Sequence, residues 1–167
     1  MKQQSGLTLL ELMITLAVAG ILLALAGPNF MSMVQNNRIT AQVNDFVTAV
    51  TMARSEAIRR SALVTLCRST DEQTCAGSGS DWASGWIVIE GEPGSYGEVL
   101  RVWSAPAGEP TMIAQGGESL VTFVGNGGAT DSLEIQYRIP GCTGDQARDI
   151  NLGRTGRTTI TRQECNP

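Results

Sequence analysis

A long apolar run near the start of the chain constrains the fold more than any other feature of the sequence. Between Leu7 and Gly27 the only polar side chains are Thr8, Glu11 and Thr15. The run has the length of a membrane-spanning helix, which needs about 20 apolar residues. A carboxylate in the middle of such a helix costs roughly 2.5–3.5 kcal/mol on insertion scales, so Glu11 requires a compensating partner.

Three interpretations of this run are open. The first is a secretory signal, because Lys2 supplies a positive charge and Ala24-Leu25-Ala26 has the small-x-small pattern of a cleavage site. The second is a plain anchor helix that tolerates an acid near its end. The third is cleavage after Gly6, which would create an amine on Leu7 close to the carboxylate of Glu11. Opposite charges would then lie at one depth in the membrane.

The stretch Gly6-Leu7-Thr8-Leu9-Leu10-Glu11-Leu12 resembles the class III leader and N-terminal helix of type IV pilins and pseudopilins. The resemblance implies that residues 1–6 are a leader, that a prepilin peptidase cuts between Gly6 and Leu7, and that Leu7 is N-methylated. Glu11 becomes the fifth mature residue, where the family's glutamate pairs with a neighbouring subunit's N-terminus during assembly. Leu7 stands where most members have phenylalanine.

The same resemblance implies a location and a set of partners. We expect the helix of residues 7–28 to cross the inner membrane once, with the head in the periplasm, and to pack in the filament core after assembly. The subunit would then be part of an extracellular pilus. The implied partners are other major and minor pilins, the prepilin peptidase and the inner membrane.

Composition limits the chemistry open to the chain. None of the 167 residues is a histidine, which removes the usual general base and the commonest metal ligand. We therefore expect no enzymatic activity, no cofactor and no metal. The formal net charge of -4 argues against a protein that binds nucleic acid over its whole surface. Any DNA-binding role must come from a local patch.

The four cysteines lack the C-x-x-C spacing of zinc and thioredoxin-like sites. Disulfides are the default in a chain exported past an inner membrane, and four cysteines allow three pairings. We expect Cys67 to pair with Cys75, closing a short loop, and Cys142 with Cys165, pinning the C-terminal tail.

Residues 29–61 continue the apolar run as an amphipathic helix, because their apolar residues recur at steps near multiples of 3.6. Together the two segments predict one helix from Leu7 to about Ser61, roughly 80 Å long, which Pro28 would kink or loosen. A solvent-bridging or coiled-coil helix is the alternative to packing against a sheet.

Residues 62–167 predict a β-rich head domain, because short apolar or alternating runs are separated by glycine-rich turns. The expected strands are residues 86–89, 97–104, 119–124, 133–139, 149–152 and 158–162. Alternation suits antiparallel strands that are wet on one face. The fold class is α+β, with a long helix packed on an antiparallel sheet.

Three further motifs in the head each have two interpretations. The Gly125-Asn126-Gly127-Gly128 sequence is a phosphate loop or a hairpin turn, and the absence of a following helix favours the turn. Trp82 and Trp86 form a stacking platform or pack over a sheet edge. The acids of residues 69–100 bind calcium or form a solvated face, and no calcium-loop spacing supports the first.

Residues 151–162 contain three arginines and no acid. Glycines place Arg154 and Arg157 at or beside a hairpin tip, where guanidinium groups suit phosphate contact. A solubilising loop explains the charges equally well. The candidate contacts to double-stranded DNA, without sequence specificity, are Arg154, Arg157 and Arg162.

The mature chain as a whole resembles the GspH/FimT group, through Met52 to Ile58, Val64 to Cys67 and the late Gly153-Arg154. The group includes minor pilins of type IV pili and the H pseudopilin of type II secretion. Some FimT-like members bind DNA through a C-terminal Gly-Arg-x-Arg stretch and serve uptake in natural transformation. Here Gly156 occupies the second arginine's place and Arg157 follows it.

The sequence therefore predicts a minor pilin with a DNA-binding arginine patch. One alternative is a type II secretion pseudopilin of the H type, which acts as a priming or tip subunit and does not bind DNA. The other is a secreted enzyme cut after Ala26, which the lack of histidine and of a nucleophile–base pair disfavours.

Overall fold

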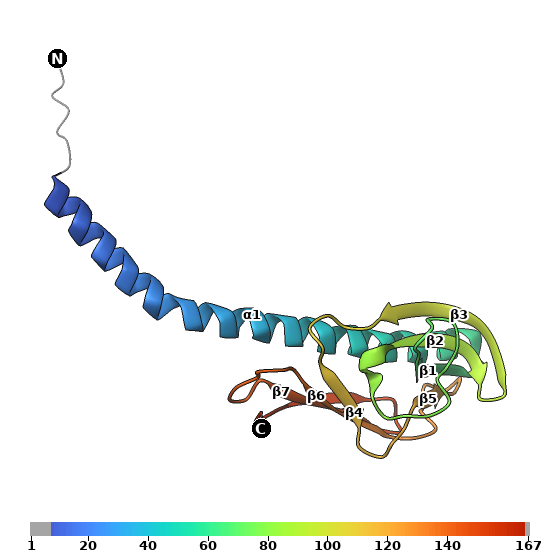
Figure 1. The fold of residues 1–167 in the computed structure, drawn as a ribbon. Helices are drawn as coiled ribbons and strands as arrows, with labels where there is room; N and C mark the ends of the chain where they lie inside the picture. The colour runs from blue at the N-terminus through green and yellow to red at the C-terminus, as the bar shows by residue number, and fades with distance from the viewer. Residues whose placement is uncertain (1–7, 166–167) are drawn as a thin grey trace. The chain divides into compact units, whose positions relative to one another are not determined.

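The computed structural model describes residues 8–165, apart from the side chains of residues 25–29 (Figure 1). The described residues fall into two compact units, one that ends at Arg38 and one that begins at Ile39. The predicted leader, the cleavage site after Gly6 and the methylation site at Leu7 lie outside the described residues.

One helix, α1, runs from Leu9 to Arg60 over 52 residues, close to the bounds that the sequence predicts. It ends at Ser61, whose positive φ of 50° breaks the helical path, and Ala62 N–H closes the last turn on the Ala57 carbonyl. Many of the apolar side chains of residues 9–23 are more than half exposed. Within the described residues, no helix is long and apolar enough to cross a membrane.

The described part of the head holds eight strands and one short 3-10 helix, η1 (Trp82–Ser84), and the strands form two antiparallel sheets. The first sheet has the order β3-β2-β1-β5, with β3 Ser95–Ser104, β2 Gly85–Glu92, β1 Val64–Arg68 and β5 Leu120–Phe123. The second has the order β4-β6-β7-β8, with β4 Thr111–Ala114, β6 Leu133–Arg138, β7 Ala147–Leu152 and β8 Thr158–Gln163.

The α+β class is confirmed, and six of these strands match predicted ones to within a few residues. The sequence analysis missed β1 and β4, and it expected one sheet where the structure has two. Strand β1 lies between β2 and β5, and its first four residues are buried. Thr65 is the only polar residue among these four, so the strand shows too little alternation to be recognised by a period-2 pattern.

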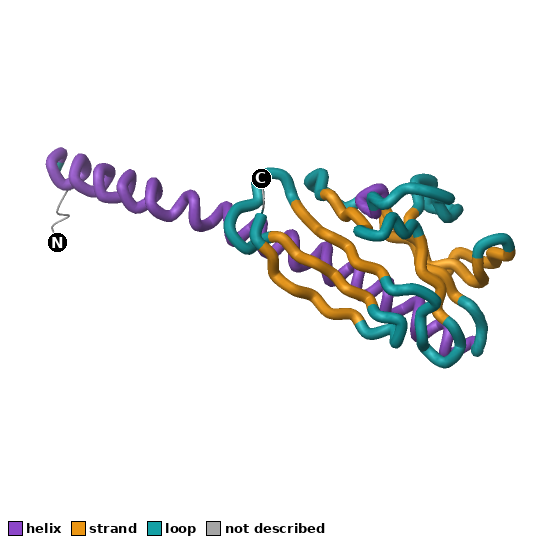
Figure 2. Tube along the Cα trace, turned by 90° about the horizontal axis from the view of Figure 1, so that it is seen from below, coloured by secondary structure: helices purple, strands orange, loops and turns teal. Residues whose placement is uncertain are grey.

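The core of the head lies between the C-terminal part of α1 and the inner faces of both sheets (Figures 1 and 2). The helix contributes a buried stripe at Ile39, Val43, Phe46, Val50 and Ala53. The Phe46 ring meets Trp82 and Trp86 edge-on, with centroids 5.5 and 5.4 Å away. Both tryptophans are buried core residues, and neither is a stacking platform.

Two disulfides fix the loops of the head, Cys67 with Cys75 and Cys142 with Cys165. This is the pairing expected from the sequence. The first closes a loop of residues after β1, within which the Asp71 carboxylate accepts hydrogen bonds from Ser69, Gln73 and Thr74. The bonds from Thr74, with help from the others, hold the pKa of Asp71 well below its usual range. This acid orders its own loop.

Candidate functional site

The β7–β8 hairpin carries the predicted DNA-binding residues at its turn, Gly153–Arg157, which we call the arginine turn. Gly156 N–H donates to the Gly153 carbonyl at 2.8 Å, and Gly153 N–H donates to the Arg157 carbonyl at 3.0 Å. Gly156 has φ of 74°, a conformation that side chains with a Cβ rarely adopt. The turn is therefore a closed, hydrogen-bonded structure that requires glycine at its centre.

A second glycine-rich turn, residues 125–128, lies against the arginine turn. Ala129 N–H donates to the Arg154 carbonyl at 2.8 Å. A Cβ on Gly156 would lie 2.4 Å from the Gly127 carbonyl oxygen, well inside contact distance. Position 156 therefore has no room for a side chain, and an arginine there would require the glycine-rich turn to move.

The arginine turn brings Arg154 and Arg157 together on the surface. The Arg154 side chain is 74% exposed, and its guanidinium lies 3.6 Å from the Asp131 carboxylate, which is 61% exposed. An exposed pair at this separation contributes at most about 1 kcal/mol to stability. Arg157 is exposed and forms no ion pair with any carboxylate in the described part of the chain. Both guanidinium groups are accessible to a ligand.

Arg162 does not join this pair. It lies near the far end of β8, opposite Arg148 in the antiparallel register, and its guanidinium is 3.6 Å from the Asp145 carboxylate. It is five residue steps along the extended strand from Arg157, or roughly 16 Å at 3.3 Å per residue. The structure thus divides the three predicted arginines between the two ends of one hairpin.

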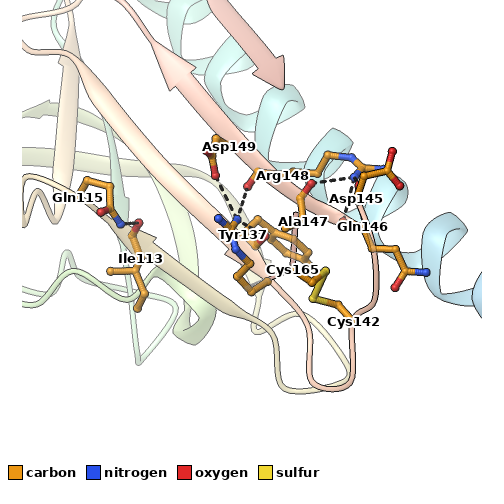
Figure 3. A network of polar contacts seen from close by, with 11 residues as sticks. Ile113, Gln115, Tyr137, Cys142, Asp145, Gln146, Ala147, Arg148, Asp149 and Cys165 are labelled. Carbon is orange, nitrogen blue, oxygen red and sulfur yellow. Dashed lines mark hydrogen bonds and ion pairs between the residues drawn. A yellow bond between two sulfur atoms is a disulfide. The ribbon is translucent and has the colours of Figure 1, made fainter. Parts of the chain in front are cut away.

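At that open end of the hairpin, arginines serve the fold (Figure 3). The Arg148 guanidinium donates to the carbonyls of Asp145, Gln146 and Ala147 at 2.8–2.9 Å. Arg138 pairs with Asp149 at 3.1 Å across β6 and β7. Burial, together with the nearby Arg162, lowers the pKa of the Arg148 guanidinium. The Cys142–Cys165 disulfide closes the same region.

One arginine that the sequence analysis did not select reaches the arginine turn from α1. Arg54 donates through Nη1 to the Gly156 carbonyl at 3.3 Å, across 102 residues of sequence. Its Nε lies 3.0 Å from the point where a Cβ on Gly156 would stand, and 3.1 Å from the equivalent point on Gly127. The helix, the glycine-rich turn and the arginine turn therefore meet at this side chain. In the sequence Arg54 was visible only as part of the helical pattern and of the Met52 to Ile58 stretch that resembles the GspH/FimT group.

Glu11, the candidate assembly residue, lies in the first turn of α1 and bonds within its own chain. Its Oε2 accepts from the Thr8 backbone N–H and from the Thr8 hydroxyl, both at 2.9 Å, while Glu11 N–H donates back to that hydroxyl at 3.2 Å. This reciprocal arrangement is a capping box, whose Thr-x-x-Glu spacing is readable in the sequence but was not used. Since a carboxylate has about four acceptor sites, capacity for a further cation is left.

Two family models match this chain. The model described as type II transport protein GspH matches residues 42–156, which is more than half of the sequence, and the prokaryotic N-terminal methylation motif matches residues 1–27. The chain belongs to the GspH family. It carries the prokaryotic N-terminal methylation motif, and its family and fold are those of pilin-like structural subunits, not of enzymes.

Curated relatives of this GspH-family chain match it over part of their length. A fimbrial protein of Pseudomonas aeruginosa is 34% identical over 73 residues, 44% of this chain and 47% of the relative. The pilin-like protein PilA1 of Thermus thermophilus is 46% identical over 63 residues, 36% of this chain and 38% of that protein. The chain thus spans less than half the length of these curated relatives.

Solved structures show the same fold. Two crystal forms of the type IV minor pilin FimU of Pseudomonas aeruginosa align with this GspH-family chain at TM-scores of 0.59 and 0.63. They are 19% and 20% identical and cover 76% and 78% of this chain, and 99% and 96% of their own. The long helix with antiparallel sheets is therefore the fold of a known minor pilin.

Proposed function

We propose that this protein is a minor pilin of a type IV pilus that enters the filament through the first half of α1. The observation that carries the proposal is the helix of residues 9–23, whose apolar side chains stand exposed. Burial in a bilayer or against other pilins would remove that surface from water. A prepilin peptidase would cut after Gly6, N-methylation would follow at Leu7, and the inner membrane would hold the subunit with its head in the periplasm before assembly.

In this proposal Glu11 sets the position of each incoming subunit. A carboxylate in an apolar filament core gains most from a cation at its own depth, and the new amine of a neighbouring pilin is such a cation. The capping box with Thr8 orients the carboxylate and leaves acceptor capacity for that amine.

The test of assembly is Glu11→Ala in the full chain, with Thr8→Ala as the matched control. Thr8→Ala removes the hydroxyl that bonds Glu11 but keeps the carboxylate. We expect both variants to be cleaved and inserted, and only Glu11→Ala to be absent from sheared pili. The readouts are N-terminal mass spectrometry and immunoblots of pili. Incorporation of Glu11→Ala at the wild-type level would contradict the proposal.

We also propose that the arginine turn binds the phosphate backbone of double-stranded DNA, which would serve uptake in natural transformation. The turn supports this role because Arg154 and Arg157 are exposed on a backbone held by hydrogen bonds at both ends. With two phosphate contacts, the logarithm of the binding constant should fall with the logarithm of the salt concentration with a slope of about -1.8. Binding would be weak, so tight capture would need several copies.

The DNA experiment is a salt series with the full chain in non-ionic detergent. We expect Arg154→Ala and Arg157→Ala each to make the slope shallower by about one. Arg101→Ala is the matched control, because Arg101 lies on the other sheet over the Trp103 ring, 5.1 Å from its centroid. Arg162→Ala tells whether a duplex also reaches the open end of the hairpin. Absence of wild-type binding at low salt would refute the DNA role.

The alternative function is a type II secretion pseudopilin of the H type, a priming or tip subunit without DNA binding. The observation behind it is the description of the matching family model, which names a type II transport protein. Such a subunit would use the same helix and head but would have no need of accessible arginines. A folded wild-type chain that enters a filament and fails to bind DNA at low salt would support this alternative.

A further inference from the structure

A cavity of about 400 Å³ opens between α1 and the start of β8, entirely within the head. We call it the Arg54 cavity. Its lining comes from three turns of the helix and from the end of the arginine turn, at Val47, Thr51, Arg54, Ser55, Ile58 and residues 156–158. No described function uses it.

The lining of this cavity is positive and rich in hydrogen-bond donors. The lining residues include Arg54, Arg157, Ser55 and Thr158, and none of them is acidic. The Thr51 hydroxyl, also in the lining, already donates to the Val47 carbonyl at 2.8 Å. Elsewhere in the described head, Arg59, Arg60, Arg138, Arg154 and Arg162 each pair with a carboxylate. Arg68 and Arg148 donate instead to backbone carbonyls, and Arg101 lies over the Trp103 ring. Arg54 and Arg157 are the two cavity arginines, and no described carboxylate pairs with either.

Arg54 is also held in place before any ligand arrives. Its bond to the Gly156 carbonyl uses one of the five donors of the guanidinium, and its Nε is buried without a hydrogen-bond partner among the described residues. A half-buried cation that lacks a counter-charge is costly, and an anion beside it offsets that cost. Because the side chain is already fixed, binding would lose little side-chain entropy.

We propose that the Arg54 cavity binds one tetrahedral oxyanion, a phosphate group, between Arg54 and Arg157, with the Ser55 and Thr158 hydroxyls as further donors. The identification of that group as a DNA backbone phosphate rests on the proposed DNA function. If the group is a DNA phosphate, Arg54 makes a third contact to the duplex from inside the Arg54 cavity, beside the two exposed arginines of the arginine turn.

The direct test is a titration of the full chain, in non-ionic detergent, with inorganic phosphate, followed by the backbone amide signals of Arg157 and Thr158. Wild type should show a saturable shift. Arg54→Gln should lose it, and Arg101→Gln, which removes the same charge from the other sheet, should keep it. A wild-type shift that does not saturate, or one that survives in Arg54→Gln, would overturn the proposal.

A second pair of variants separates binding from support of the turn, since Arg54→Gln also removes the bond to Gly156. Thr51→Glu places a carboxylate on an exposed helix residue of the cavity lining and leaves Arg54 and Gly156 intact. Thr111→Glu adds the same charge on β4, at the opposite edge of the second sheet from β8. We expect phosphate binding to be lost only in Thr51→Glu. Equal binding in both variants would mean that Arg54 acts only on the turn.

Duplex DNA tests the source of the phosphate separately. If wild type binds DNA, Thr51→Glu should weaken binding more than Thr111→Glu, and Arg54→Gln should make the salt slope shallower by about one. If wild type binds DNA and Arg54→Gln has the same salt slope as wild type, the cavity is not part of the DNA interface. The arginine turn would then keep its proposed role in DNA binding. If wild type does not bind DNA, the DNA role fails, and the phosphate titration alone decides whether the cavity is an oxyanion site.

Discussion

The two ends of the β7–β8 hairpin use arginine in opposite ways. At the open end Arg148 is buried and bonded to three backbone carbonyls, and Arg138 is paired with Asp149. At the arginine turn, the side chains of Arg154 and Arg157 are exposed, and the two bonds that close the turn are donated by the backbone N–H groups of Gly153 and Gly156. A buried arginine whose guanidinium is bonded to several backbone carbonyls, such as Arg148, is not available to a partner. The number of arginines that can contact a ligand therefore depends on which backbone carbonyls lie nearby, and not only on how many arginines a segment contains.

The largest effect that would test this contrast is on stability. Arg148→Met should lower the free energy of unfolding by about 2 kcal/mol, because three carbonyls lose their donor. Arg154→Met should change it by less than about 0.5 kcal/mol, as expected for an exposed residue. Urea unfolding of both variants measures the difference. Equal losses would mean that the two ends are not distinct.

The next effect concerns the backbone of the turn. Gly156→Ala should lower the free energy of unfolding by about 1–2 kcal/mol, because the residue has positive φ and a Cβ would meet the Gly127 carbonyl. Gly153→Ala is the matched control, since a Cβ there has no neighbour closer than 3.9 Å and the residue lacks positive φ. Urea unfolding that ranks Gly153→Ala as the more damaging change would contradict this account of the turn.

A smaller effect is on the pH dependence of stability, which should differ between arginines that pair with a carboxylate and arginines that donate to backbone carbonyls. Hydrogen bonds from Arg59 and Arg60 lower the pKa of Glu56 to about 2, from an unfolded value near 4.5. Because the folded pKa is the lower one, this stabilisation is present above about pH 4.5 and is lost as the pH falls towards 2. Glu56→Gln should flatten that part of the stability profile in acid unfolding experiments, whereas Arg148→Met should leave its slope unchanged.

The smallest effect is on DNA affinity. Asp131→Asn removes the carboxylate that competes for Arg154 and should raise affinity about twofold at low salt, as expected for an exposed pair. Asp145→Asn removes a carboxylate at the same 3.6 Å distance from Arg162, and should raise affinity less if binding is confined to the turn. A larger gain from Asp145→Asn would move the interface to the open end. Fluorescence anisotropy with a short duplex measures both.

The sequence predicted those parts of the molecule that depend on local pattern. The bounds of α1, six strands and the glycine-rich turns follow from periodicity and from turn residues, and the short Cys67–Cys75 loop follows from spacing. Strand β1 was missed because its first four residues include only one polar residue and so show too little alternation to mark a strand. The division into two sheets depends on pairings between distant strands, which no local pattern contains.

The candidate site shows the same limit. Arg154 and Arg157 were placed correctly at a turn because glycines flank them. Arg162 was grouped with them by sequence distance, although an extended strand carries it away from the turn. Arg54 was missed because its contact with Gly156 joins residues 102 positions apart.

The Cys142–Cys165 disulfide has a consequence for the hairpin as a whole. It joins the chain before β7 to the chain after β8, so both strands and the arginine turn lie inside one covalent ring. A protease that cuts the turn opens the ring without releasing a fragment. The nicked protein keeps both halves of its arginine turn attached to the head and gains only the mass of one water, and the C-terminal fragment separates only after reduction.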